Sequence, residues 1–272
     1  MVSMPAGTIG RMRPESSPPQ RPWDPALEEL ARAIVRGGGA AALTGAGISV
    51  ASGIPDFRSP RGLWSRFDPM EYATIEAFRA DPEKVWRFLR ELERIVRGAR
   101  PNAAHRALAA LEEQGWLEGI ATQNVDGLHQ AAGSRRVIEL HGSGRALVCL
   151  GCGRRYPAAE RAGLGDPPRC RCGRILKPDA VLFGEMLPLG AYERALALVR
   201  GVPVLLVIGT SAAVYPVAEL PREARAAGAL VCEFNLEPTE LTGGVAQLTI
   251  RGPADRTLPA LLEAVARRSR GS

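Results

Sequence analysis

Short apolar runs alternate with helical patterns that have one apolar face, and this alternation restricts the possible folds more than any other feature of the chain. The runs predict short, largely buried strands over residues 40–44, 119–122, 137–140, 204–209, 230–235 and 248–250. Between most of them lie the helical patterns, over residues 24–37, 102–114, 190–200 and 216–227. Such alternation predicts a parallel sheet with helices on both faces. We therefore expect an α/β fold with a Rossmann-like, doubly wound parallel sheet.

Two stretches break this alternation and predict a small second lobe. Residues 57–102 look wholly helical, and residues 145–178 are rich in Cys, Gly, Pro and Arg. Because ligands of open α/β sheets bind at the carboxyl ends of the strands, a lobe inserted there would cover the binding site and form a cleft. The other segments divide into a Rossmann-like domain and two tails: 23–56, 103–144 and 179–266 for the domain, 1–22 for a disordered tail and 267–272 for a basic tail.

The net charge of +6 does not indicate a nucleic-acid-binding surface. Most of it comes from arginines between residues 11 and 21 and between residues 267 and 270, so the body of the chain is nearly neutral. No apolar run approaches the roughly 18 residues of a membrane span, and we expect no secretory signal, since the first residues lack a basic-then-apolar pattern. We expect a cytoplasmic protein that binds neither nucleic acid nor membrane. The sequence does not predict its oligomeric state, and a monomer is one of the possibilities.

Four cysteines in two pairs, Cys149-x-x-Cys152 and Cys170-x-Cys172, predict one structural zinc ion. Four thiolates fill the tetrahedral coordination of zinc and leave no open position for catalysis. The second pair departs from the common two-residue spacing, so its cysteines need a tight local turn to share the metal. Unpaired core thiols and disulfides are the alternatives, and a reducing compartment disfavours the disulfides. Cys232 stands alone in an apolar strand and is expected in the core.

The segment GAGIS at residues 45–49 follows the first predicted strand and is a candidate phosphate-binding loop. Glycines let backbone N–H groups approach a pyrophosphate, but Gly45-x-Gly47 lacks the third glycine of the dinucleotide fingerprint, and short pairs of this kind also arise by chance. Its position between a buried strand and a polar loop favours the phosphate role. The loop continues with GIPDFR at residues 53–58, which combines a rigid turn with an acid, an aromatic ring and a base.

Polar side chains also follow two later strands. Gln123, Asn124 and Asp126 come directly after a buried strand, where ligands of α/β sheets bind, although an ordinary strand-end turn is the alternative. His141 follows the next strand, and Gly142 beside it would leave room for a ligand. An isolated histidine is more often structural, but the shared sheet edge favours a role for His141 in the same site. Two histidines are weaker candidates, one in a predicted helical turn and one near the start of a surface helix: His129 and His105.

Taken in order, these and two later motifs resemble the sirtuins, a family of NAD-dependent protein-lysine deacylases. The motifs are GAGIS at 45–49, GIPDFR at 53–58, TQNVDGLH at 122–129, HG at 141–142, FGE at 183–185 and GTS at 209–211. The cysteine pairs lie in the matching interval, and the resemblance, to the bacterial type, covers residues 26–262. Such an ordered set is far more specific than any one motif.

The resemblance implies a reaction that consumes NAD. The acyl-lysine oxygen would attack the ribose carbon as nicotinamide leaves, and a general base would then activate a ribose hydroxyl to accept the acyl group. The products would be nicotinamide, O-acyl-ADP-ribose and free lysine. By its match to the HG motif, His141 would be that base, and an imidazole suits the task.

The resemblance also assigns the contacts with NAD. Gln123 and Asn124 would orient the ribose. Asp126 with Ile54 would hold the nicotinamide amide, and Phe57 would shield the intermediate from water. The other implied NAD contacts are Gly45, Ala46, Gly47, Ser49, Pro55, Asp56, Arg58, Val125, Gly209, Thr210, Ser211, Asn235, Leu236, Glu237 and Ala254.

A strand over residues 181–185 would pair with the backbone of the acyl-lysine peptide as an added strand, with contacts from Val181, Phe183, Gly184 and Glu185. The acyl group would lie against the helix that opens at residue 81. Sirtuins that prefer acidic acyl groups carry a Tyr-x-x-Arg pair on this helix, and here Leu89 and Leu92 stand in those positions. Without the arginine, burial of a carboxylate would be costly, so we expect neutral acyl groups such as acetyl or longer aliphatic chains.

Two other classes of function remain open from the sequence. One is protein ADP-ribosyl transfer from the same bound NAD. The other is a non-enzymatic role, as a zinc-ribbon nucleic-acid binder or as a sensor of NAD or ADP-ribose. The nearly neutral body and the intact set of His141, Asn124 and Asp126 argue against the non-enzymatic role.

Overall fold

The computed structural model describes residues 25–57, 60 and 62–271. The predicted tail at 1–22 and the predicted NAD contact of Arg58 lie outside the described residues. Within them, no helix is both long and apolar enough to cross a membrane.

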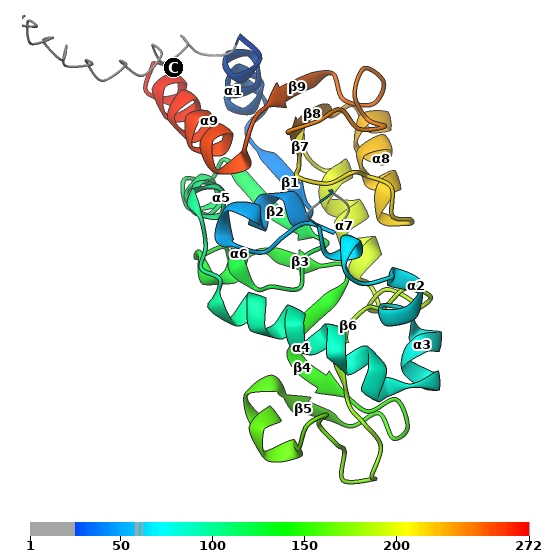
Figure 1. The fold of residues 1–272 in the computed structure, drawn as a ribbon. Helices are drawn as coiled ribbons and strands as arrows, with labels where there is room; N and C mark the ends of the chain where they lie inside the picture. The colour runs from blue at the N-terminus through cyan, green and yellow to red at the C-terminus, as the bar shows by residue number, and fades with distance from the viewer. Residues whose placement is uncertain (1–24, 58–59, 61, 272) are drawn as a thin grey trace, which may run out of the picture.

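A six-stranded parallel sheet forms the centre of the larger lobe (Figure 1). Its strands run side by side in the order β3, β2, β1, β7, β8, β9, and every neighbouring pair is parallel. This confirms the Rossmann-like prediction, and the strand order reverses between β1 and β7, where ligands of doubly wound sheets bind. The strands are β1 (Ala40–Thr44), β2 (Leu117–Thr122), β3 (Val137–Glu139), β7 (Val204–Ile208), β8 (Leu230–Asn235) and β9 (Leu248–Arg251).

Helices cover both faces of this sheet (Figure 1). On one face α1 (Pro25–Gly37), α5 (Ala103–Glu113) and α9 (Ala254–Ser269) pack their apolar sides into one core cluster with the strands. On the other face α7 (Ala191–Arg200) and α8 (Leu220–Ala226) bury alanine, valine and leucine side chains in a second cluster. Because both faces are covered, the strands are apolar on both sides, as the sequence predicted. Short turns of helix connect the elements at η1 (Ala46–Ser52), α6 (Leu128–Ala131) and η4 (Val217–Glu219).

The first part of the small lobe is helical but broken into pieces. A short turn, η2 (Leu63–Ser65), is followed by α2 (Pro69–Tyr72), α3 (Ile75–Ala80) and α4 (Pro82–Gly98). Three side chains cap the α-helices by accepting from backbone N–H groups: Asp68 from Met70, Thr74 from Ala77 and Asp81 from Lys84. Each cap starts a new helix in a new direction, which is why one continuous helical stretch does not form.

The second part of the small lobe is a three-stranded antiparallel sheet in the order β5, β4, β6. Its elements are β4 (Gly142–Val148), β5 (Arg155–Pro157), η3 (Ala158–Leu164) and β6 (Lys177–Ala180). β4 begins directly after His141 and ends at Val148, next to Cys149, and β6 returns from the cysteine module. These two strands therefore connect the carboxyl edge of the large sheet, at His141, to the predicted zinc site. Leu147 of β4 and Leu176, which directly precedes β6, share one apolar cluster with Trp86 of α4.

Candidate active site

Two glycine loops meet where the strand order reverses. The loop after β1 and the loop after β7 touch through their backbones, with the Gly47 N–H donating to the Gly209 carbonyl at 2.8 Å. A Cβ added at Gly47 would lie 2.6 Å from the Gly209 Cα, so no side chain fits between the loops. Gly209 also has a φ of +59°, which favours glycine. The result is a bare backbone surface at the carboxyl ends of two parallel strands, which suits the close approach of a pyrophosphate.

Polar side chains just after β2 and at the end of β8 fix the shape of this surface. The Gln123 amide donates to the Thr210 hydroxyl at 2.8 Å, and the Asn124 amide donates to the Gly45 carbonyl at 3.1 Å. From the next strand, the Asn235 amide donates to the Thr210 carbonyl at 2.9 Å. The structure therefore brings together the residues that the sequence placed on separate loops. The amide groups hold the two glycine loops in register from both sides.

Asp126 lies beside this surface and is held at both oxygens. The Ser49 hydroxyl donates to one carboxylate oxygen at 2.7 Å, and the Leu128 N–H donates to the other at 2.9 Å. Ile54 is buried against Leu128, and its own N–H donates to the Ser49 carbonyl at 3.3 Å. The resemblance assigns both Asp126 and Ile54 to the nicotinamide amide, and in the structure both contact Ser49 and Leu128.

His141 is half-buried at the end of β3, and one ring nitrogen has a fixed partner. Its Nδ1 lies 3.0 Å from the Gln123 carbonyl. Because a carbonyl only accepts, Nδ1 carries the proton and the neutral ring keeps a lone pair on Nε2. Burial lowers the pKa of His141, and the bond to the carbonyl opposes that shift. The ring is therefore neutral at neutral pH, with Nε2 able to accept a proton.

Gly142 does not leave room for a ligand, contrary to the sequence interpretation. It has a φ of +71°, and a Cβ there would lie 2.2 Å from the backbone oxygen of Asp179. The glycine is needed because β6 passes directly against this point of β4.

Aromatic rings link the loop after β1 to the segment after β6. The rings of Phe57 and Trp64 have centroids 5.0 Å apart, and those of Trp64 and Phe183 are 6.2 Å apart. Phe57 and Trp64 also pack on the apolar cluster that contains Leu89, which is 6% exposed, and Leu92 lies partly buried at its edge. The two leucines predicted to face the acyl group thus lie in apolar surroundings.

Residues 181–185 do not form a regular strand, so the prediction of a strand there is wrong. The strand β6 ends at Ala180, and the next residues turn because the Glu185 N–H donates to the Leu182 carbonyl at 3.0 Å. Only Phe183 makes a bridge, with Thr74 in the helical part of the lobe. The segment still adjoins the candidate general base, since the Val181 N–H donates to the His141 carbonyl at 2.8 Å.

The remaining predicted NAD contacts lie along the same edge of the sheet. Leu236 and Glu237 are exposed just after β8, and Ala254 opens α9 after β9. Ser211 is exposed beside buried Thr210. Half-buried positions on the loops after β1 and β2 make up the rest: Ala46, Pro55, Asp56 and Val125.

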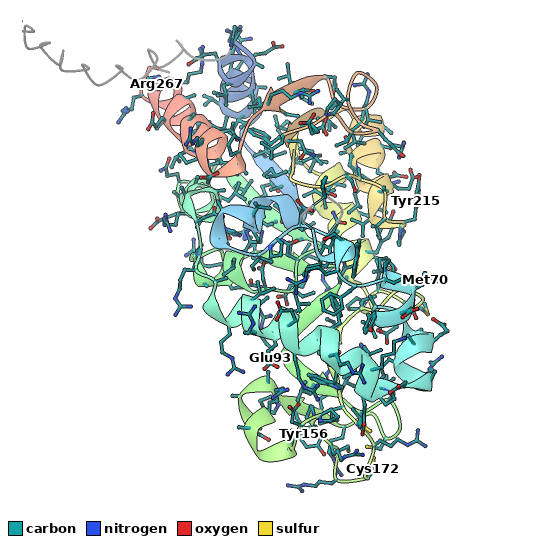
Figure 2. The ribbon with its side chains drawn as sticks, viewed as in Figure 1. Met70, Glu93, Tyr156, Cys172, Tyr215 and Arg267 are labelled. Carbon is teal, nitrogen blue, oxygen red and sulfur yellow. The ribbon has the colours of Figure 1, made fainter. Side chains whose placement is uncertain are left out.

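The four cysteines come together at the end of the small lobe, where Figure 2 shows Cys172 and Tyr156. Their sulfur atoms all lie within 4.8 Å of one another, with 3.5 Å between Cys149 and Cys172 and 3.6 Å between Cys152 and Cys170. Tetrahedral zinc with bonds of about 2.3 Å requires sulfur atoms about 3.8 Å apart, so the set fits one zinc ion with no open position. All four are free thiols, and the short spacing is accommodated by the turn in which the Gly173 N–H donates to the Cys170 carbonyl. Cys232 is fully buried in the core, as predicted.

Comparison with known proteins agrees with the resemblance found in the sequence motifs. The model of the Sir2 family matches residues 45–216. The chain belongs to the Sir2 family. It is 50% identical over 228 residues to NAD-dependent protein deacylase 2 of Pyrobaculum aerophilum, covering 84% of this chain and 91% of that protein.

Solved Sir2 structures share the whole fold. A Sir2 homologue in complex with ADP-ribose superposes with a TM-score of 0.85 at 41% identity and covers 90% of this chain and 98% of its own. Sir2Af2 bound to a myristoylated histone peptide superposes with a TM-score of 0.77 at 36% identity, covering 91% of this chain and 99% of its own.

This Sir2 chain also has a buried polar network that the sequence interpretation missed. His105 is fully buried, not on an exposed surface, and accepts from the Asn102 N–H at 3.3 Å as part of the cap of α5. Its other nitrogen lies 3.5 Å from the Ser49 hydroxyl, which in turn donates to Asp126. Burial lowers the pKa of His105 to about 4, and the charge of Asp126 opposes this shift. The signal in the sequence was the Asn-x-x-His spacing at the start of the predicted helix.

His129 belongs to the same network in the Sir2 chain. The Thr44 hydroxyl donates to Thr122 at 2.8 Å and lies 2.9 Å from His129 Nε2, so that nitrogen must donate and carry the proton. Burial lowers the pKa of His129 to about 3. The ring centroids of His129 and His105 lie 5.0 Å apart. Both histidines are neutral and buried beneath the residues of the site.

Proposed function

We propose that this chain removes acetyl or other neutral acyl groups from lysine side chains of proteins, with NAD as co-substrate. One water molecule is consumed, and the products are nicotinamide, O-acyl-ADP-ribose and the free lysine. Membership of the Sir2 family supports this reaction, as do the ADP-ribose and acyl-peptide complexes of its structural neighbours.

The observation that carries the proposal is the fixed tautomer of His141. Its Nδ1–H is held by the Gln123 carbonyl at 3.0 Å, and burial keeps the ring neutral, so Nε2 is the only nitrogen left to accept a proton. A general base needs both properties. Gln123 itself starts the polar segment directly after the neighbouring strand β2, so the base and the ribose-orienting amides share one sheet edge.

The other residues bind and orient the reactants. NAD supplies the ribose carbon that loses nicotinamide and the hydroxyl that accepts the acyl group. The glycine loops after β1 and β7 hold the pyrophosphate through backbone N–H groups, and Gln123 and Asn124 orient the ribose. Asp126, fixed by Ser49, holds the nicotinamide amide. Phe57 covers the reacting carbon and excludes water.

The acyl-lysine peptide binds beside residues 181–185, and its acyl chain extends toward Leu89 and Leu92. The apolar cluster around these leucines favours neutral chains, since a carboxylate there would lose its hydration without gaining an ionic partner. Backbone contacts dominate peptide binding, so sequence selectivity is low.

We propose that the protein acts in the cytoplasm and binds neither nucleic acid nor membrane. Four cysteines whose sulfur atoms gather in a zinc-like cluster, without disulfides between them, fit a reducing compartment. The proposed division into a Rossmann-like domain and a small lobe of residues 57–102 and 145–178 fits the separate apolar clusters of the two parts.

The test is mass spectrometry of an acetyl-lysine peptide incubated with the purified protein, with and without NAD. We expect loss of the acetyl group only with NAD, together with O-acetyl-ADP-ribose. The His141→Ala variant should lose this turnover and still bind ADP-ribose, which shows that it folds. If the peptide stays acetylated in the presence of wild-type protein and NAD, peptides with longer neutral acyl groups are tested next.

Product analysis also separates the other functions. If acyl groups survive in every case while ADP-ribose becomes attached to protein, the chain is an ADP-ribosyltransferase and the deacylase proposal fails. Binding of NAD without any consumption would indicate a sensor and would likewise refute the proposal.

A further inference from the structure

Lys177 is buried at the start of β6, and its ammonium group is enclosed by acceptors. The residue is 3% exposed. Its Nζ donates to the Pro178 carbonyl at 3.0 Å and to the Ala180 carbonyl at 2.6 Å, and it lies 2.9 Å from a Glu185 carboxylate oxygen. These three partners use all three ammonium protons. Such an arrangement is specific, because a buried cation is costly unless every proton is satisfied.

Glu185 extends this arrangement across the turn that follows β6. The oxygen that faces Lys177 also accepts from the Leu182 N–H at 2.8 Å. The carboxylate therefore ties the end of the turn both to its beginning and to the strand before it. Acceptors at both ends of residues 178–185 thus bind one ammonium group. Among the described residues, no other lysine or arginine forms an ion pair with Glu185.

The same turn is fixed on its outer sides by two elements of the site. The Val181 N–H donates to the His141 carbonyl at 2.8 Å. Phe183 donates its N–H to the Ala73 carbonyl and accepts from the Ile75 N–H, both at 2.9 Å. On the remaining edge, the N–H and C=O of Gly184 have no hydrogen-bond partner among the described residues. An incoming peptide backbone can pair only with such free groups.

We infer that Lys177 is a positioning residue for the acyl-lysine peptide: paired with Glu185, it holds residues 181–185 in the conformation that receives the peptide backbone. This inference rests on the proposed deacylase function. Lys177 touches neither reactant, since it lies beneath the turn. Its effect falls on the peptide, because NAD binds at the glycine loops after β1 and β7.

The test compares steady-state constants of Lys177→Met with those of the wild type. Loss of the ammonium leaves the Glu185 carboxylate without its ion pair and frees the turn, so we expect the KM for an acetyl-lysine peptide to rise about tenfold or more. The KM for NAD, the zinc content and the affinity for ADP-ribose should change little. A general loss of structure would move all of these quantities together.

The chain provides a matched control. Lys84 is its only other lysine and forms an exposed ion pair with Glu71 at 2.8 Å on α4. The Lys84→Met variant carries the same chemical change and should keep the wild-type KM for both substrates. Lys177→Arg retains a cation with several donors and should keep the peptide KM within about threefold of the wild type, since an ion pair with Glu185 can still form.

A double-mutant comparison tests whether the pair acts as a unit. Glu185→Gln should raise the peptide KM in the same direction, and Lys177→Met with Glu185→Gln should be no worse than Lys177→Met alone. If Lys177→Met fails to fold, Lys177→Arg and Glu185→Gln carry the test, and equal peptide KM values for these two would overturn the inference.

The two proposals fail in different ways. If the wild type turns over the peptide and Lys177→Met has an unchanged peptide KM, only the role of Lys177 is refuted. A wild type that consumes no NAD with any acyl peptide would overturn the deacylase function and this inference with it.

Discussion

Replacement of Gly47 by alanine should separate the two glycine loops that form the floor of the nucleotide site. The new Cβ would lie 2.6 Å from the Gly209 Cα and 2.9 Å from its carbonyl oxygen, distances that real Cβ atoms do not adopt. Both neighbours are backbone atoms, so no side chain can rotate away. Overpacking of this kind costs about 1–3 kcal/mol.

The strain can appear in two measurable quantities. If the loops stay together, the folded state carries the cost, and the Tm falls by roughly 2–12 °C for a chain of this size. If the loops move apart, ADP-ribose must draw them together again, and its Kd rises by about 5-fold to 150-fold for the same energy. Calorimetry of unfolding and titration with ADP-ribose measure both quantities on one sample.

Gly98→Ala is the matched control, because no atom beyond its chain neighbours and the backbone of its own helix lies within 4 Å of its Cβ position at the end of α4. Alanine is favoured over glycine in helices by about 0.5–1 kcal/mol, so the control should keep or slightly raise the Tm. A Gly47→Ala variant with the Tm and the ADP-ribose Kd of the wild type would refute the close contact between the loops.

Three further results are expected. Burial lowers the pKa of His129 to about 3 from its ordinary 6.5, so the unfolded chain takes up a proton at higher pH than the folded chain. The contribution of this neutral ring to the free energy of unfolding is therefore present above pH 6.5 and is lost as the pH falls from 6.5 toward 3. His129→Gln should flatten the pH dependence of the free energy of unfolding over that range, and an unchanged slope would exclude His129 as its source. Cys172→Ser should reduce bound zinc below one ion per chain by metal analysis and lower the Tm; full zinc occupancy would show that three sulfurs suffice. A succinyl-lysine peptide should turn over more slowly than its acetyl counterpart, and the reverse order would show that a cation reaches the pocket of Leu89 and Leu92.

Sequence patterns predicted the sheet well because its strands are buried on both faces. Runs such as 204–209 and 230–235 are apolar on both sides, which is typical of a buried strand. The strands β7 and β8 begin at the predicted residues. The site followed from the same logic, since polar residues just after buried strands must gather at one edge of a parallel sheet. The sequence alone therefore predicts that His141, Gln123 and Asn124 lie together at one edge of the sheet.

Contacts between distant segments could not be predicted in this way. Gly142 looked like a space for a ligand, but the passage of β6 against it depends on how the small lobe folds back. Residues 181–185 have the apolar pattern of a strand, yet Glu185 turns the chain by binding Lys177, a pairing that no local pattern indicates. His105 was assigned to a surface helix because its burial depends on Ser49 and Asp126, which come from other loops.

The contact between the two glycine loops links nucleotide binding to the order in which the chain assembles. One loop follows the first strand and the other follows the seventh, with the entire small lobe between them in the sequence. The loops can meet only when β1 and β7 have paired, which is a long-range and therefore late event in folding. A dinucleotide that spans both loops binds the completed sheet alone and stabilises it by mass action. Protection by NAD against proteolysis should thus extend to β7 and β8, far along the sequence from the loop that first identified the site.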